Sequence, residues 1–301
     1  MRSSKQIWTK ELRESLKGYT LIAPAIFLLC VFTIYPMFYI VNSSLYDGSL
    51  LSRTRNFIGL KNFETLSGSV NFHVTVLNTI TYSFSLVSIM MVLATLFALW
   101  VNSKMQRRMN ELTLAAIFTP HIVSLVSVSM IFMWIMDPRI GAINHIVQLL
   151  GFQPFPFLAS PRTALASLVM MMIWKGLGYY TLLILAALKG IPKDIYEAAE
   201  LDDAPKIVTF FRITLPMISP TLFFITIVAT ISSFQVFEII NLMTQGGPAF
   251  STNTLVFMIY SDAFKNLNLG VASAQGVVLL IFVAILTTFY FVFLSRRVHY
   301  R

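Results

Sequence analysis

Long apolar runs are the feature that most constrains this chain. A helix needs about 20 mostly apolar residues to cross the hydrocarbon core of a bilayer. Because only 12% of the residues are charged and 56% are hydrophobic, little chain remains for a large soluble domain beside several spans. The sequence therefore predicts an all-α membrane protein with six transmembrane helices, roughly Tyr19–Val41, Asn78–Val101, Leu112–Met136, Ala164–Leu188, Thr221–Met243 and Val271–Leu294.

The loops between these spans differ in positive charge. Of the 22 Lys and Arg residues, 15 lie in the N-terminus, the C-terminal tail and the loops Asn102–Glu111 and Lys189–Pro216, and only 6 lie in the other loops. Because Lys and Arg collect in cytoplasmic loops, we expect both termini and the Lys189–Pro216 loop to be cytoplasmic. The net charge of +9 then has an explanation without nucleic acid.

The first 18 residues form a separate predicted segment. Trp8, Leu12 and Leu16 recur every four residues among charged ones, which is typical of an amphipathic helix on a membrane surface. The apolar run that follows is too long for the core of a signal peptide, so we expect a retained first span, with a kink near Pro24 or Pro36. The predicted division is an N-terminal helix, 1–18, and a six-span domain, 19–301.

The sequence lacks the known motifs of catalysis and of thiolate metal binding. Cys30 is the single cysteine, so an internal disulfide and a thiolate metal site are excluded. The chain has no HExxH motif or nucleophile–base set and no G-x-x-x-x-G-K-[ST] phosphate loop. We predict no catalytic residue, no metal and no cofactor in this chain.

Three loops on the opposite side from the termini mix apolar with polar residues: Asn56–Leu66, Asp137–Phe152 and Thr244–Thr254. The second has apolar residues at helical spacing, which predicts a short helix on the outer surface. Three interpretations stand for these loops: simple connections, a cap over a cavity, or a docking face.

The loop 189–216 is unusually polar for this chain. Pro192 ends the preceding helix, and Lys193–Leu201 is rich in helix-forming residues. We expect the Asp202-Asp203 pair to end this helix, Asp203 or its neighbour to cap a second one, and Leu215-Pro216 to end that second helix before the fifth span. The loop is thus predicted to be a cytoplasmic helix–turn–helix.

Acidic residues separate two interpretations of this helix pair. Helices that lie in lipid headgroups usually carry Lys and Arg on their polar face, whereas this stretch carries Asp194, Glu197, Glu200, Asp202 and Asp203. Anionic lipid would repel these carboxylates and a basic groove on a partner protein would not, although a headgroup helix pair remains the alternative.

The same stretch resembles the "EAA" coupling loop of permeases from binding-protein-dependent ABC importers. Its three parts are Glu197-Ala198-Ala199, Asp202-Asp203-Ala204 and Ile213-Thr214-Leu215-Pro216. Asp203 departs from the pattern, because the family prefers Gly for a left-handed turn there, and Asp adopts that conformation at a cost. The resemblance implies that Glu197, Ala198, Ala199, Asp202, Asp203, Ala204, Leu215 and Pro216 contact an ATPase or tie the loop to the membrane.

Further motifs extend the resemblance over most of the chain. The stretches FIGLKNFETL, DPRIGAINHIVQLLGF, AALKGIPKDIYEAA and TQGGPAFSTNTLVFMIYSDAF are similar to those of the carbohydrate branch, the maltose and glycerol-phosphate importer type. The GGP loop and the Phe-Ile-Gly-Leu-Lys-Asn segment resemble the maltose-F-like half of the permease pair.

This resemblance implies the type I importer permease fold and a set of partners. They are a second homologous six-span permease, two cytoplasmic ATPase subunits that bind ATP and Mg, an extracytoplasmic solute-binding protein, a sugar substrate and the surrounding membrane lipid. The implied location is the cytoplasmic membrane of a bacterium or archaeon.

Polar residues inside spans suggest a substrate path, since such residues are costly in lipid. Lys175 and Tyr179 share one helix face, and Gln235 and Glu238 share another. One hypothesis is that these faces line the path for a sugar. The other is that Lys175 and Glu238 form a structural ion pair. His121, next to Pro120, is expected to be a bundle residue and not a ligand.

A stand-alone secondary transporter or channel is the alternative function. Such proteins use intramembrane carboxylates and inverted repeats. Glu238 is the one acidic residue well inside a predicted span, and no internal repeat is evident.

Overall fold

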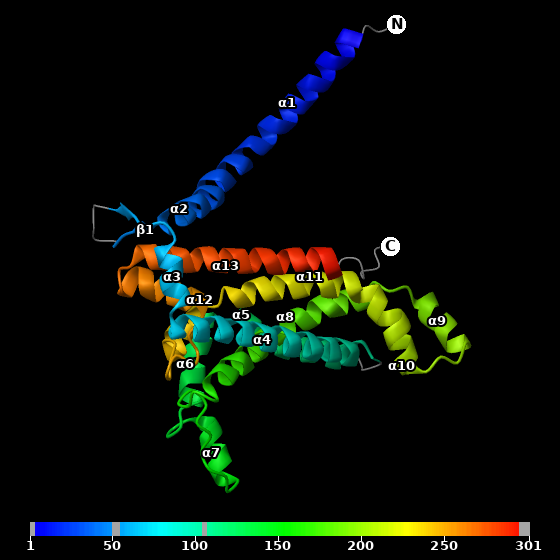
Figure 1. The fold of residues 1–301 in the computed structure, drawn as a ribbon. Helices are drawn as coiled ribbons and strands as arrows, with labels where there is room; N and C mark the ends of the chain where they lie inside the picture. Colours follow the sequence, from blue (N-terminus) through cyan, green and yellow to red (C-terminus); the bar gives the residue numbers. More distant parts are fainter. Residues whose placement is uncertain (1–3, 50–54, 104–106, 295–301) are drawn as a thin grey trace. The chain divides into compact units, whose positions relative to one another are not determined.

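The computed structural model describes residues 4–49, 55–103 and 107–294. The chain divides into two compact units, which we describe separately. Unit 1 comprises Met1–Leu66 and Asp262–Val277, and unit 2 comprises Ser67–Ser261 and Val278–Arg301. Apart from one two-stranded antiparallel pair in unit 1, the regular structure in the described ranges is helical, as predicted (Figure 1).

Unit 1 is formed by the N-terminal helices, a small hairpin and the start of the last long helix. Its elements are α1 (Ser4–Leu29), the π-helical segment η1 (Cys30–Ile34), α2 (Tyr35–Ser43), β1 (Tyr46–Asp47), β2 (Asn56–Phe57), α3 (Lys61–Ser67), the π-helical segment η4 (Ser261–Lys265) and the first turns of α13 (Leu269–Phe289).

The first helix differs from the prediction at its boundary. Because α1 runs from Ser4 to Leu29 without a break, the helical parts of the predicted N-terminal segment and first span are one helix; residues 1–3 lie outside the described ranges. The irregularity comes later, before Pro36, where the Tyr35 N–H donates to the Cys30 carbonyl five residues back. A π turn of this kind fits a following proline, whose ring cannot tolerate a regular turn.

Buried amides hold unit 1 together. Asn62 Nδ2 donates to the carbonyls of Ser44, at 2.8 Å, and Tyr46, at 3.0 Å. Gln275 is fully buried and donates to the Asp262 carboxylate at 2.5 Å. The predicted Asn56–Leu66 loop is therefore ordered around Asn62.

Unit 2 contains most of the long helices. Its elements are α4 (Val70–Asn102), α5 (Arg107–Ile122), α6 (Leu125–Ile135), α7 (Ala142–Leu149), α8 (Ala164–Lys189), α9 (Lys193–Leu201), α10 (Lys206–Thr209), η2 (Phe210–Thr214), α11 (Leu215–Phe234), η3 (Ile240–Thr244), α12 (Leu255–Tyr260), the remainder of α13 and η5 (Tyr290–Leu294).

The number of spans agrees with the prediction, but one is broken. Among the described residues, five helices are long and apolar enough to cross a membrane. A sixth span results if Glu111–Ile122 and Leu125–Ile135 are counted together, although these two helices meet at 98°. The predicted span Leu112–Met136 is therefore bent sharply after Ile122. Pro120, which removes one helical hydrogen bond and strains the preceding turn, lies just before the bend.

The fifth span lies earlier than predicted. The helix is continuous from Lys206 to Phe234, so Leu215-Pro216 does not end it, contrary to the prediction. A π turn again accommodates the proline, because the Leu215 N–H donates to the Phe210 carbonyl. The regular helix ends at Phe234 instead of continuing toward Met243.

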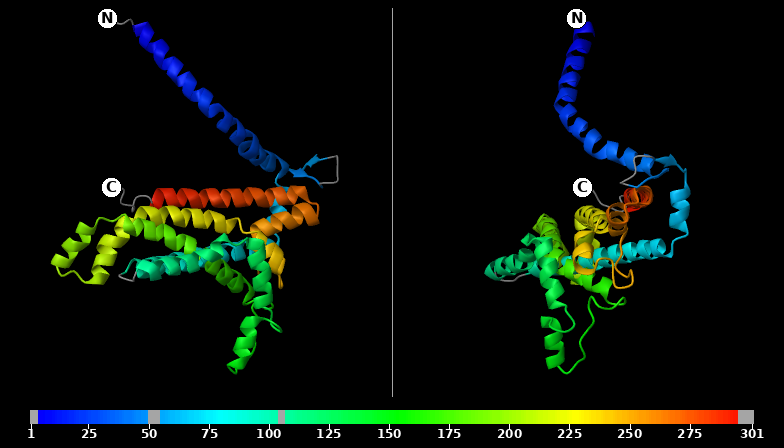
Figure 2. Two further views of the ribbon diagram at one scale, coloured as in Figure 1. Left: turned by 180° about the vertical axis from the view of Figure 1, so that it is seen from behind. Right: turned by 90° about the vertical axis from the view of Figure 1, so that its left-hand side faces the viewer.

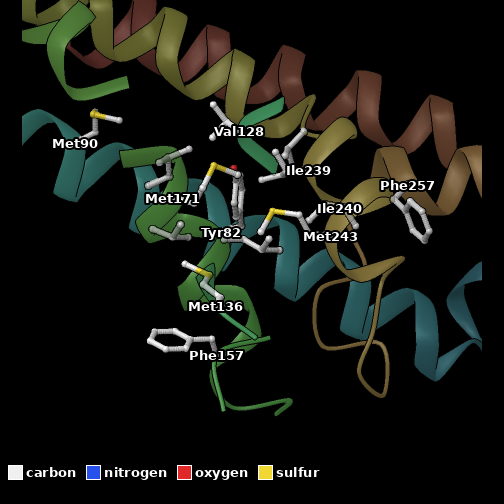
Figure 3. Packing of buried hydrophobic residues seen from close by; sticks show 14 residues of the cluster. Tyr82, Met90, Val128, Met136, Phe157, Met171, Ile239, Ile240, Met243 and Phe257 are labelled. Atoms are coloured by element: carbon white, nitrogen blue, oxygen red, sulfur yellow. The ribbon is translucent and has the colours of Figure 1, made fainter. Parts of the chain in front are cut away.

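Two buried apolar clusters connect α4 and α8 in unit 2, the first with the segment after α11 and the second with α11 itself. The first includes Tyr82, Met171 and Ile239, whose side chains converge in Figure 3. The second includes Ala94, Ala98, Ile184 and Ile218. The small Ala94 and Ala98 side chains are fully buried, so α4 can approach its neighbours closely. These clusters fix the helices that line the cavity described below.

The predicted Thr244–Thr254 loop packs on α4. Asn78 Nδ2 donates to the Phe250 carbonyl at 2.7 Å, and Asn253 Nδ2 donates to Thr75 Oγ1 at 2.9 Å. The Leu255 N–H donates to Thr79 Oγ1 at 3.0 Å. These hydrogen bonds fix the loop on α4, so it is more than a simple connection between helices.

Candidate functional site

A cavity of about 640 Å³ lies inside unit 2, within the size range of small-molecule sites. All four residues predicted for the substrate path line it: Lys175, Tyr179, Gln235 and Glu238. Its other walls come from α4, from the α5–α6 break and from α11; they include Tyr82, Leu86, Val87, Met90, His121, Leu125, Gly176, Tyr180, Ser232, Ser233 and Phe237. The four predicted residues therefore share one cavity.

Lys175 holds the break between α5 and α6. Its ammonium donates to the carbonyl oxygens of Val123, at 2.6 Å, of His121, at 3.2 Å, and of Pro120, at 3.3 Å. The last carbonyls of a helix have no partner within the helix, and their partial negative charge attracts a cation. Lys175 therefore satisfies backbone groups that the break would leave unpaired in an apolar bundle.

This arrangement contradicts the alternative of a Lys175–Glu238 ion pair. Among the described residues no ion pair joins the two side chains, and the three carbonyls take all three ammonium hydrogens. Lys175 has a structural role, but its partner is the broken helix and not Glu238.

Gln235 and Glu238 reach the cavity in a different way from the predicted one. They do not share a helix face, because α11 ends at Phe234 and the chain is irregular through Val236 and Phe237. Irregular backbone at membrane depth is tolerated where it is buried in protein or lines a cavity. The apolar run Thr221–Met243 hides this break, since hydrophobicity does not report helix continuity.

Two breaks therefore meet at one cavity, the first after Ile122 and the second after Phe234. Lys175 bonds the carbonyls at the first break, and at the second break Gln235 and Glu238 line the cavity. This is an arrangement in which a polar ligand can find hydrogen bonds inside a membrane protein.

Aromatic rings form another part of the wall. The His121 imidazole stacks on the Tyr179 ring, with centroids 4.6 Å apart and planes at 9°, and Tyr180 meets Tyr179 edge to face. His121, predicted to be a bundle residue and not a ligand, also lines the cavity. Its neighbour Pro120, a helix breaker, was the available signal.

Tyr82 is a second residue that sequence reasoning missed. Its side chain is completely buried, it lines the cavity, and its hydroxyl has no hydrogen-bond partner among the described residues. Buried hydroxyls are nearly always paired, so a ligand or water in the cavity would satisfy it. Its position in an aromatic-rich apolar helix gave no signal in the sequence.

The cavity offers rings for apolar surfaces and side-chain amide, carboxylate and hydroxyl groups for polar edges. In the described ranges no group of three His, Cys, Asp or Glu side chains could hold a metal ion. The arrangement suits a polyhydroxylated ligand held by stacking and hydrogen bonds.

The predicted helix–turn–helix is present and projects from the ends of α8 and α11 (Figures 1 and 2). Its first helix, α9, ends in a Schellman motif, in which the N–H of Ala204 donates to the Ala199 carbonyl and that of Asp203 to the Glu200 carbonyl. Asp203 itself is left-handed, with φ of 49°. The turn therefore keeps its geometry despite the missing glycine.

One detail of this helix pair was predicted wrongly. Neither Asp203 nor another side chain caps the second helix; Pro205 occupies the N-cap position without a side-chain hydrogen bond. Asp203 is left-handed and belongs to the turn that ends α9. It lies two residues before the N-cap of α10, Pro205.

The alanine pair of the loop is divided between two environments. Ala199 is 7% exposed and faces its own unit, whereas Glu197 and Ala198 are exposed. The hydroxyls of Tyr196 and Thr214, 3.1 Å apart, join the two helices. Large apolar side chains are left on the outside: Leu201 at 87%, Ile207 at 72% and Phe211 at 60% exposure.

Comparison with known proteins agrees with this geometry. Residues 90–300 match the family "Binding-protein-dependent transport system inner membrane component". The sn-glycerol-3-phosphate transport system permease protein UgpA of Agrobacterium fabrum is 32% identical over 283 residues, 94% of this chain and 96% of that protein. The sulfoquinovosyl glycerol transport system permease protein SmoG of the same organism is 34% identical over 278 residues, 90% and 89% of the two chains.

A solved structure shares the fold. The bacterial alginate ABC transporter in complex with alginate pentasaccharide-bound periplasmic protein contains a chain with a TM-score of 0.83. The match covers 93% of this chain and 94% of that one, at 24% identity. The predicted permease fold is confirmed by this likeness.

Proposed function

The chain belongs to the family of binding-protein-dependent transport system inner membrane components, and on this premise we propose that it forms half of the path through which an ABC importer takes up a sugar or sugar-like polyol. The observation that carries the proposal is the cavity in unit 2, where two helix breaks and several aromatic rings meet. The alternative of a stand-alone secondary transporter or channel is set aside because of the family membership.

The substrate class is supported by the relatives and by the cavity together. UgpA and SmoG are named for glycerol-3-phosphate and sulfoquinovosyl glycerol, polyol compounds that each carry an acidic group. The cavity combines Tyr179 and Tyr180 with the polar groups of Gln235 and Glu238. We include anionic sugars and polyols among the substrates.

The coupling role falls to the helix–turn–helix. Its exposed carboxylates and its apolar residues Leu201, Ile207 and Phe211 fit a groove on a cytoplasmic ATPase subunit better than an anionic lipid surface. Glu197, Ala198, Asp202 and Asp203 supply the exposed polar contacts; Ala199, Ala204, Leu215 and Pro216 shape the loop and its connection to α11. ATP and Mg are held by the two ATPase subunits.

The complete importer would contain this chain, a homologous six-span permease, two ATPase subunits and an extracytoplasmic solute-binding protein. The positive charge of the loops supports a cytoplasmic location for both termini and α9–α10. The site of action is the cytoplasmic membrane of a bacterium or archaeon.

Uptake in proteoliposomes tests the proposal. The chain is co-expressed with the subunits that co-purify with it, and uptake of radiolabelled glycerol-3-phosphate and of neutral sugars is measured with the binding protein present. We expect uptake only when ATP is enclosed on the α9–α10 side. Uptake by this chain alone, or uptake driven by an ion gradient without ATP, would refute the proposal.

A further inference from the structure

The helix α7 exposes a continuous apolar surface. Ile146, Leu149 and Leu150 are 58%, 74% and 68% exposed, and Phe152, just beyond the helix, is 68% exposed. Ile140, before the helix, is 69% exposed. Such a patch on a soluble surface usually marks a binding face for a protein or a membrane.

The polar residues of α7 lie on a separate arc. At 100° per residue, Leu149, Ile146 and Leu150 form one apolar arc, which borders His145 and lies opposite or well away from Gln148. The stretch 142–152 has no Lys, Arg, Asp or Glu. The helix is therefore amphipathic, with polar residues that include neither Lys or Arg nor Asp or Glu.

A buried amide fixes the direction of the apolar face. Asn144 is 1% exposed; its Nδ2 donates to the Phe155 carbonyl at 2.9 Å, and its Oδ1 accepts from the Phe155 N–H at 2.7 Å. A longer bond, of 3.3 Å, joins Nδ2 to the Asp137 carbonyl. Because these bonds hold α7 to both flanking segments, it cannot simply rotate to bury Leu149 against its own unit.

The position of α7 matches the edge of the bilayer. The chain leaves the apolar bundle when α6 ends at Ile135 and re-enters it when α8 begins at Ala164. Asp137 accepts the N–H groups of Arg139 and Ile140, which hold the pKa of its carboxyl below the usual value. An ionised group at this point marks the polar boundary only a few residues before α7.

The orientation of α7 agrees with that depth. In Figures 1 and 2, α7 runs across the direction of α4, α8 and α11, near the ends of these helices that lie away from α9 and α10. Since the long helices cross the bilayer, a helix that runs across them is directed along the membrane plane.

We propose that α7 is an interfacial helix that inserts Ile146, Leu149 and Leu150 among the acyl chains of the leaflet farther from α9 and α10, with His145 and Gln148 toward the headgroups. Its partner is the lipid surface itself. A solute-binding protein is the less suitable occupant, because it must leave after each delivery and would then return all these apolar side chains to water. The inference does not depend on which solute is carried.

Spin labels on the two faces test the proposal. In the full-length Cys30→Ala chain, purified with its accompanying subunits and placed in phosphatidylcholine–phosphatidylglycerol nanodiscs, single cysteines replace Ile146, Leu149, His145 or Gln148. Each is nitroxide-labelled, and collision with oxygen, which concentrates in lipid, is compared with collision with a water-soluble nickel chelate. Two positions on each face keep the comparison readable if one variant is not produced.

We expect labels at Ile146 and Leu149 to collide at least threefold more with oxygen than with the chelate, a label at Gln148 to show the reverse, and a label at His145, at the border of the apolar arc, to fall between them. Equal chelate access on both faces would mean a hydrated loop and overturn the proposal. Shielding of Ile146 and Leu149 from both reagents would mean a protein partner and would also overturn it. Since no solute or ATP is added, these outcomes are independent of the transport test.

Discussion

At the scale of single residues, Lys175 acts as a cap for a broken helix. A hydrogen bond to a charged group contributes about 1.5–3 kcal/mol, and the ammonium makes one such bond of 2.6 Å and two longer ones. We predict that Lys175→Met lowers the thermal unfolding midpoint of the purified transporter and its uptake, and that Lys175→Arg restores part of both.

Glu238→Gln provides the control for this prediction. Because Lys175 is bonded to carbonyls and not to Glu238, the double variant Lys175→Met/Glu238→Gln should be no more stable than Lys175→Met alone. Recovery of stability or uptake in the double variant would restore the ion-pair interpretation.

Asp203 has a backbone conformation that is unfavourable for a residue other than glycine. Its left-handed φ of 49° costs a non-glycine residue about 1–2 kcal/mol. We predict that Asp203→Gly strengthens the end of α9, so that the Ala204 amide, which donates to Ala199, exchanges its hydrogen several-fold more slowly. Hydrogen-exchange mass spectrometry of the α9–α10 segment measures this.

Asp202→Asn serves as the matched variant, because Asp202 has an ordinary φ of −83° and should leave the exchange unchanged. Faster exchange in Asp203→Gly would mean that the Asp203 carboxylate contributes more to the turn than its conformation costs.

At the scale of elements, the packing of α8 against α5 depends on a glycine. A Cβ on Gly178 would collide with backbone atoms of Ile117 and Phe118, whereas one on Gly176 would meet the flexible end of Met90. We predict that Gly178→Ala destabilises unit 2 by about 1–3 kcal/mol, while Gly176→Ala is nearly neutral. Thermal unfolding in detergent compares them, and equal midpoints would show that α5 moves aside at little cost.

The elements also show what the sequence could predict. Span number, the helix–turn–helix and the four cavity residues followed from apolar length, helix-ending residues and the cost of polar groups in lipid. The continuity of each helix did not follow, because apolar residues continue across the breaks after Ile122 and Phe234. At Pro216 the sequence predicted a helix end, but a π turn lets the helix continue. Carbonyl capping by Lys175 depends on residues more than 50 positions away, so no local pattern could reveal it.

At the scale of the whole molecule, the proposed transport cycle needs a mechanical path from an ATPase to the cavity. The helix that begins at Lys206, in the helix–turn–helix, continues to Phe234, between the cavity-lining residues Ser233 and Gln235. The contact between the hydroxyls of Tyr196 and Thr214 ties α9 to this helix. A movement of the helix–turn–helix would therefore be transmitted to Gln235 by a single continuous helix. The π turn at Phe210–Thr214 is the irregular point along that helix.

Substitution of an exposed apolar residue in the helix–turn–helix tests this mechanical connection to the ATPase. Burying an isoleucine side chain contributes about 1.5–3 kcal/mol, and each 1.4 kcal/mol changes an affinity tenfold. We predict that Ile207→Asp reduces co-purification of the ATPase subunits at least tenfold and abolishes uptake, while the unfolding midpoint of the membrane part stays unchanged, since Ile207 is 72% exposed. Lys193→Ser, an exposed polar change at the start of α9, should leave co-purification intact. If the Ile207→Asp variant retained the ATPase subunits, the helix–turn–helix would instead be a helix pair in the lipid headgroups, the alternative given by the sequence. Its carboxylates would then need an explanation other than a groove on a partner protein.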